Sequence, residues 1–104
     1  MSHTEHTTGD VAVPERPAPH PDVETAYLSP EAVLYDDRSG TVIHLNGSAA
    51  AVWMLLDGTL DIDGLSTELA VIFEVSAETI RADVQAALAS YAGQNLLVEG
   101  PAGA

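Results

Sequence analysis

The feature that most constrains this chain is a pair of short apolar runs joined by a polar turn. Residues 33–35 and 42–45 are rich in β-branched, aliphatic and aromatic side chains, and the turn at residues 36–40 contains a glycine. This pattern predicts a β-hairpin. Directly after it, residues 49–56 change to a helix-forming composition that ends before Gly58. A hairpin that runs straight into a helix leaves two apolar faces to bury, so later helices must cover them.

Three helix starts follow from capping residues. Asn46-Gly47 is a strong hairpin signal, but the Ala- and Leu-rich sequence after it favours Asn46 as an N-cap, with a helix from residue 47 or 48 to 56. Asp61 and Ser76 are expected to cap a second and a third helix, and Asn95 to end the third in the left-handed conformation. The apolar residues of these two helices recur at helical spacing and are expected to face the core: Ile62, Leu65, Leu69, Ile72 and Phe73, then Ile80, Val84, Ala87, Leu88 and Tyr91.

The predicted fold class is α+β and winged-helix-like, with an N-terminal antiparallel β-sheet of two or three strands followed by three helices. Residues 24–28 are the candidate third strand, closed by Ser29-Pro30. One domain is expected, at residues 23–99, with residues 96–98 folding back as an apolar tail. Residues 1–22 are rich in Pro and His and are expected to be a disordered or extended polyproline-like arm, and residues 100–104 a flexible tail.

Charge and composition exclude several partners. The formal net charge is −13, from 16 acids against three Arg and no Lys, so the surface repels nucleic-acid phosphates and anionic lipid. No run of about 18 apolar residues predicts a membrane span, and the N-terminus does not resemble a secretory signal. The absence of cysteine fits a reducing cytoplasm.

The residues that usually carry catalysis do not form a recognisable set. There is no Gly-rich phosphate loop, HExxH motif, nucleophile elbow or Cys/His cluster. The paired acids could be proposed as a general acid and base, but turn chemistry and helix capping account for them, and nothing at a solvated turn would raise a pKa. No metal site is expected of the N-terminal histidines, because a mobile segment fixes no ligand geometry. We therefore expect no enzyme, no cofactor and no metal. The residues weighed and set aside are Asp36, Asp37, Asp61, Asp63, His3, His6, His20 and His44.

Two other non-enzymatic classes fit poorly. A DNA-binding winged helix needs a basic recognition helix, whereas the third helix carries Glu78 and Asp83 against Arg81 alone. An acyl carrier protein needs its attachment Ser directly after an Asp at the start of a helix, whereas Ser66 lies inside one. The β-hairpin is also foreign to that four-helix fold.

Several short motifs follow one another in order across residues 24–99: Leu34-Tyr35-Asp36, Gly40, Leu45-Asn46, Ala50, Trp53, Leu56-Asp57-Gly58, Ile80-Arg81-Ala82-Asp83-Val84 and Leu96-Leu97. Their order and spacing resemble the PqqD family of peptide chaperones, also called RiPP recognition elements. Some capping and turn positions depart from the family pattern, with Asp61 and Gly64 in place of a Thr/Glu capping box, and Glu74 and Asn95 in place of glycines. These departures leave the expected fold intact and the subfamily open.

The resemblance implies a domain that binds the leader segment of a ribosomally made precursor peptide as an added β-strand. It then presents that precursor to a modifying enzyme, either a radical S-adenosylmethionine maturase or a leader peptidase. On this chain the edge strand is Thr41, Val42, Ile43, His44 and Leu45, and the groove wall is Arg81, Val84, Gln85 and Leu88.

Each of these residues also has an ordinary structural interpretation. Alternation places Ile43 and Leu45 toward the core and Val42 and His44 outward. Val84 and Leu88 are core residues by period, and they serve either as core alone or also as groove floor. Arg81 either pairs with Glu78 or Asp83 or holds an acidic leader residue, and Gln85 and His44 are candidates for polar contact. The alternative function is a winged-helix protein–protein interaction module that does not bind a leader.

Overall fold

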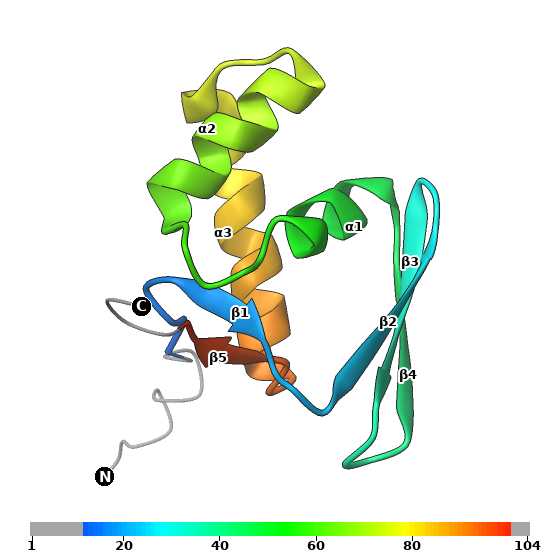
Figure 1. Cartoon of the computed structure of the whole chain (residues 1–104). Coiled ribbons are helices and arrows are strands. Elements are labelled where there is room, and N and C mark those ends of the chain that lie inside the picture. The colour runs from blue at the N-terminus through cyan, green and yellow to red at the C-terminus, as the bar shows by residue number, and fades with distance from the viewer. Residues whose placement is uncertain (1–11, 101–104) are drawn as a thin grey trace, which may run out of the picture.

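The computed structural model describes residues 12–100; the predictions for residues 1–11 and 101–104, including His3 and His6, lie outside them. Within this range an antiparallel sheet precedes three helices, as predicted, and a second, two-stranded sheet joins the two ends of the chain (Figure 1). The elements in chain order are β1 (Pro17–Pro19), β2 (Val23–Leu28), β3 (Glu31–Asp36), β4 (Thr41–Leu45), α1 (Gly47–Met54), α2 (Ile62–Phe73), α3 (Ala77–Gly93) and β5 (Leu97–Glu99).

The main sheet has the strand order β2-β3-β4, which confirms both the hairpin and its third strand. Its inner face packs on the helices through alternate residues. Leu34 is fully buried between Thr25 of β2 and Ile43 of β4, its partners in the register. Ile43 is half-buried and Leu45 is buried, whereas Val42 and His44 are exposed, as the period-2 pattern predicts.

The predicted caps begin all three helices. The side-chain oxygens of Asn46, Asp61 and Ser76 accept hydrogen bonds from the backbone N–H groups of Ala49, Gly64 and Thr79. Each thereby satisfies one N–H that the first helical turn leaves without a partner. The first helix ends at Met54, two residues earlier than predicted.

Trp53 of α1 lies at the centre of the core and is 1% exposed. Its indole Nε1 donates to Thr25 Oγ1 of β2 at 3.0 Å, and its ring meets Tyr91 of α3 edge-on with the centroids 5.2 Å apart. The Tyr91 hydroxyl donates to the Ala49 carbonyl of α1 at 2.7 Å. These contacts tie the sheet, α1 and α3 into one packed unit.

The prediction of a disordered or extended polyproline-like arm is corrected at residues 17–19, which form a strand, and the apolar tail at residues 96–98 is more regular than expected. Pro17–Pro19 is strand β1, and it pairs antiparallel with β5 from the other end of the chain. Both carboxylate oxygens of Glu99 accept backbone N–H bonds, from Glu15 at 2.8 Å and from Arg16 at 3.0 Å. A proline-rich segment is ordered here because these long-range bonds satisfy its backbone.

Two predicted core positions are also wrong. Ile72 is 56% exposed and Phe73 is 39% exposed, although the helical period places them with the buried residues Leu65 and Leu69. The reason lies in the packing: the C-terminal end of α2 extends beyond α1 (Figure 1), and a hollow separates Phe73 from Val52 of α1. The apolar stripe therefore continues in the sequence past the point where the core ends.

Candidate functional site

Strand β4 is an edge of the main sheet, because it pairs with β3 on one side and with no other strand among residues 12–100 on the other. The hydrogen-bonding direction of its residues follows from the register. The Asp37 N–H donates to the Asp22 carbonyl, toward β2. The main-chain N–H and C=O of the neighbouring residue, Asp36, therefore point the other way, toward β4, where Asp36 is the register partner of Thr41. Alternation along β4 then directs Thr41, Ile43 and Leu45 to β3 and turns the N–H and C=O groups of Val42 and His44 to the open edge.

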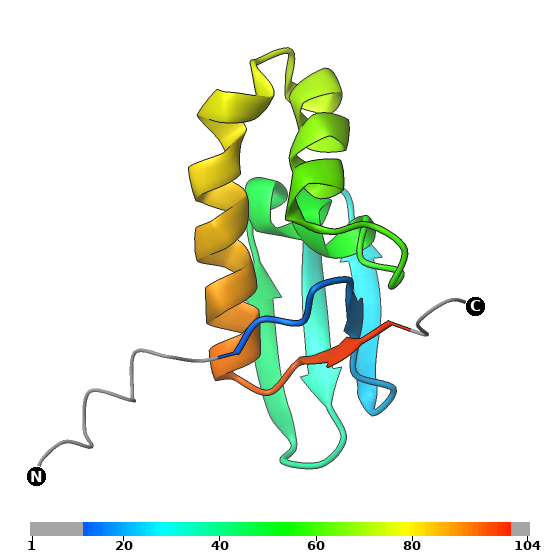
Figure 2. The same cartoon turned by 90° about the vertical axis from the view of Figure 1, so that its left-hand side faces the viewer.

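Helix α3 runs along the β4 side of the sheet, whereas β2 forms the far edge (Figure 2). An ion pair and a hydrogen bond, both made by one arginine, fix this arrangement. Arg38, in the hairpin turn, donates to both carboxylate oxygens of Asp36 at 2.9 Å and to the Asn95 carbonyl beyond α3 at 2.6 Å. The Arg38 guanidinium holds the pKa of Asp36 below its ordinary value. The hairpin turn is therefore attached to the C-terminal end of α3.

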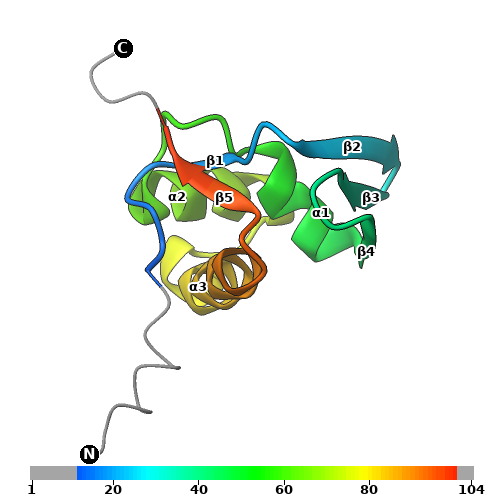
Figure 3. The same cartoon turned by 90° about the horizontal axis from the view of Figure 1, so that it is seen from below.

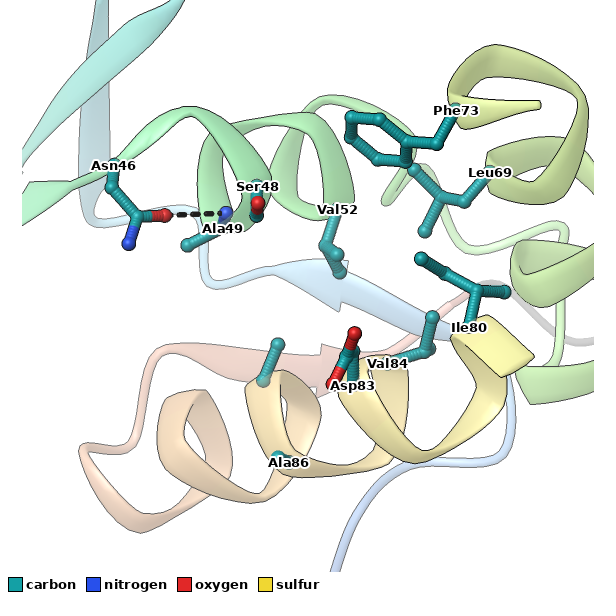
Figure 4. A pocket seen from close by; sticks show the side chains of 11 residues that line it. Asn46, Ser48, Ala49, Val52, Leu69, Phe73, Ile80, Asp83, Val84 and Ala86 are labelled. Atoms are coloured by element: carbon teal, nitrogen blue, oxygen red, sulfur yellow. Dashed lines mark hydrogen bonds between the residues drawn. The ribbon is translucent and has the colours of Figure 1, made fainter. Parts of the chain in front are cut away.

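A hollow of about 410 Å³ opens where β4 ends, between α1, α2 and α3. Figure 4 shows Leu69, Phe73 and Ile80 facing Val52 across it, with Val84 below. Most of the remaining lining is small, and its polar groups belong to Asn46, Ser48 and Asp83. The whole lining is Asn46, Ser48, Ala49, Val52, Leu69, Phe73, Ile80, Asp83, Val84, Ala86 and Ala87.

This arrangement can hold an extended peptide. A strand laid along β4 meets the main-chain groups of Val42 and His44, which bond to any sequence, while the hollow accepts a large apolar side chain. Residues 12–100 contain no group of three or more His, Cys, Asp or Glu placed to hold a metal ion. No helix in that range has the length and apolar character needed to span a membrane.

The structure brings together some of the predicted site residues and separates others. Thr41–Leu45 is β4 in full, and Val84 lines the hollow at its end. Gln85 and Leu88 instead border a second hollow of about 470 Å³, which Val13 and Pro14 of the N-terminal segment also line. Gln85 therefore lies on a different side of α3 from the first hollow.

Arg81 forms an ion pair with Asp63 of α2, which is neither of the two acids predicted as its partners. Its side chain remains 42% exposed. Leu88 is 1% exposed and belongs to the core.

Sequence reasoning placed Ile80 and Ala87 on the core face of the third helix but did not assign them, or Asp83, to the peptide site. In the structure these three residues border the hollow. The available signal for a hollow at this place was the pair of alanines at 86 and 87, because small side chains leave room beside a helix. The contributions of Val52 from α1 and Phe73 from α2 depend on how the helices pack, and no local signal indicates them.

Two solved structures resemble this fold. One is described as "TbiB1 in Complex with the TbiA(beta) Leader Peptide", with 22% sequence identity and a TM-score of 0.69, covering 77% of this chain and 93% of that one. The other is "Lasso peptide synthetase B1 complexed with the leader peptide", with 23% identity and a TM-score of 0.68, covering 80% and 98%. A search of curated protein sequences gives no match.

The family comparison covers most of the ordered domain. The model for "Coenzyme PQQ synthesis protein D (PqqD)" matches residues 31–97, from the start of β3 to the start of β5. That range includes the open edge of β4, the hollow beside it and all of α3. With more than half of its length matched, this chain belongs to the PqqD family.

Proposed function

We propose that this protein is a non-catalytic peptide chaperone that binds the leader of a ribosomally synthesised precursor by strand addition to β4. It presents the bound precursor to a separate modifying enzyme, a radical S-adenosylmethionine maturase or a leader peptidase, in the cytoplasm. The observation that carries the proposal is the open edge of β4, where Val42 and His44 face outward beside an apolar hollow. Membership of the PqqD family and the leader peptides in both similar structures support it.

The two parts of the site have different tasks. Val42 and His44 together offer two donors and two acceptors, and each main-chain bond contributes about 0.5–1.5 kcal/mol in any sequence. Specificity then comes from the hollow, because burying one large apolar side chain there is worth about 1.5–3 kcal/mol. The leader is therefore expected to carry an aromatic or large aliphatic residue next to its paired segment.

The peptide-binding residues of this proposal are centred on β4 and the facing side of α3. Thr41–Leu45 supplies the edge, and Val84 supplies part of the hollow. Arg81 and Gln85 stay in the proposal as residues that a longer leader reaches after it leaves the edge. The buried Leu88 stays in it as part of the floor of the second hollow, which Gln85 also borders. An acidic leader residue would have to compete with Asp63 for Arg81.

Filling the hollow tests the proposal. The substitution Ala87→Phe places a ring among Val52, Ile80 and Val84, whereas Ala89→Phe adds the same ring at an exposed position on another side of α3. Fluorescence anisotropy with a labelled leader gives the affinity of each variant. Ala87→Phe is expected to weaken binding by about 10- to 150-fold, the equivalent of 1.5–3 kcal/mol, and Ala89→Phe to leave it unchanged.

A salt series provides a second criterion. Main-chain pairing and apolar burial are weakly screened, so leader affinity should change only modestly between low and high ionic strength. A wild-type protein that binds no leader, or equal affinity in the two Phe variants, would reject the proposal.

A further inference from the structure

The outer face of the main sheet has the wrong composition for a surface that stays in water. An antiparallel sheet with one face on the core normally carries polar residues on the other face. The outward positions here are mostly apolar instead: Glu24, Ala26, Leu28, Glu31, Val33, Tyr35, Val42 and His44. The sequence therefore keeps an apolar character on this face that the core does not require.

Most of these side chains are open to solvent, and Val33 is half-buried. Leu28 is 59% exposed, Tyr35 43% and Val42 63%. The register places Tyr35 directly beside Val42, and Val33 between Ala26 and His44, so the apolar side chains adjoin one another across three strands. The described helices lie on the other side of the sheet (Figures 1 and 3). A contiguous apolar patch of this kind marks a contact surface for another protein.

Charge indicates what kind of protein covers the patch. Glu24, opposite Tyr35, lies close enough to Asp37 that a shared hydrogen bond and like charge raise the pKa of Glu24 above its ordinary value. Glu31 borders the other end of the face. The whole chain carries 16 acids against three Arg, and Arg38 and Arg81 already pair with acids. A second copy would place these acids against each other, whereas a rim of Lys and Arg would complement them.

The face is continuous with the proposed peptide site. Val42 and His44 direct their main-chain groups to the open edge and their side chains to this outer face. A protein docked on the face therefore lies next to a peptide bound along β4.

We propose that the outer face of β2, β3 and β4 is the docking surface for the modifying enzyme, through an apolar centre bordered by Lys and Arg. This inference rests on the proposed function, and it names the surface by which the second protein is recruited. The peptide and the enzyme then occupy different surfaces of the same sheet, so the two binding events can be separated by mutation.

The test uses a double variant, Leu28→Thr with Tyr35→Thr, which removes apolar contact while keeping β-branched residues in the strands. The control is Val71→Thr on α2, at a position that is 75% exposed. The probe is the purified enzyme that processes the precursor. Biolayer interferometry measures its association with each variant, and anisotropy measures leader affinity.

The double variant is expected to weaken enzyme association at least tenfold and to leave leader affinity unchanged, and Val71→Thr to change neither. Wild-type association with the enzyme should also fall steeply with salt, unlike leader binding. Circular dichroism confirms that the variants are folded. Unchanged enzyme association in a folded double variant would overturn the inference.

Two other outcomes are distinguishable. Self-association of the chain in sedimentation equilibrium, lost in the double variant, would assign the face to a second copy and overturn the inference. Failure of the wild-type protein to bind leader would instead reject the proposed function, because enzyme association is measured separately with the peptide-free chain.

Discussion

Replacing Val42 with proline tests the direction in which β4 presents its backbone. Because the Val42 N–H points to the open edge, its loss removes no bond to β3. Proline is tolerated at such edge positions, so the free energy of unfolding should fall by about 1 kcal/mol or less. A peptide added to the edge, however, loses a donor, and the proline ring occupies the space where the added strand would lie.

The magnitude follows from the unpaired group. A carbonyl of the bound peptide that is buried without a donor costs about 1–3 kcal/mol, which corresponds to a loss of affinity of about 5- to 150-fold. His44→Pro should behave in the same way. A variant that combines Val42→Pro and His44→Pro lacks both outward donors and should bind no leader at measurable concentrations.

Two controls separate this effect from others. Val42→Thr keeps the N–H and the β-branched shape at a side chain that is 63% exposed, so affinity should be retained. Ile43→Pro removes a bond within the β3–β4 ladder, opposite the fully buried Leu34, so it should lower the melting temperature markedly. Anisotropy with a labelled leader and thermal unfolding by circular dichroism give both quantities. Full leader affinity in a folded Val42→Pro variant would refute strand addition at this edge.

Three further predictions concern stability. Thr25→Val leaves the buried Trp53 indole N–H without an acceptor and should lower the free energy of unfolding by about 1–3 kcal/mol; an unchanged melting temperature would contradict the contact. Burial raises the pKa of Tyr91 well above its ordinary value, so the folded state keeps this proton when the unfolded state loses it, and stability should fall as pH rises above about 10. Denaturant unfolding at several alkaline pH values should show that fall flattened in Tyr91→Phe. Arg38 lowers the pKa of Asp36, so the ionised Asp36 carboxylate stabilises the folded state above the unfolded pKa of about 3.9. That stabilisation is lost as pH falls through the folded pKa, so acid unfolding should be less pH-dependent in Asp36→Asn.

Features set by neighbouring residues could be predicted from the sequence. Asn46, Asp61 and Ser76 cap helices because a side-chain oxygen reaches an N–H two or three residues later, which needs no tertiary partner. Asn95 adopts the left-handed conformation after α3, as predicted, with φ of 60°. The outward orientation of Val42 and His44 follows from strand period alone.

Features set by packing could not be predicted in this way. Strands β1 and β5 have three residues each and come from opposite ends of the chain, so neither carries a periodic signal of its own. The prolines of β1 argue against a strand in the absence of its partner. Likewise, the side of α3 that borders the hollow depends on how α3 docks on α1, which separates Ala87 from Gln85 although both lie on the same helix.

Amide hydrogen exchange along β4, with and without leader, tests strand addition most directly. In the free protein, Ile43 and Leu45 direct their N–H groups to β3 and should exchange slowly, whereas Val42 and His44 should exchange fast. Saturating leader is predicted to slow exchange at Val42 and His44 selectively. If both amides remain fast while the peptide is bound, the leader does not join this sheet and the account is contradicted.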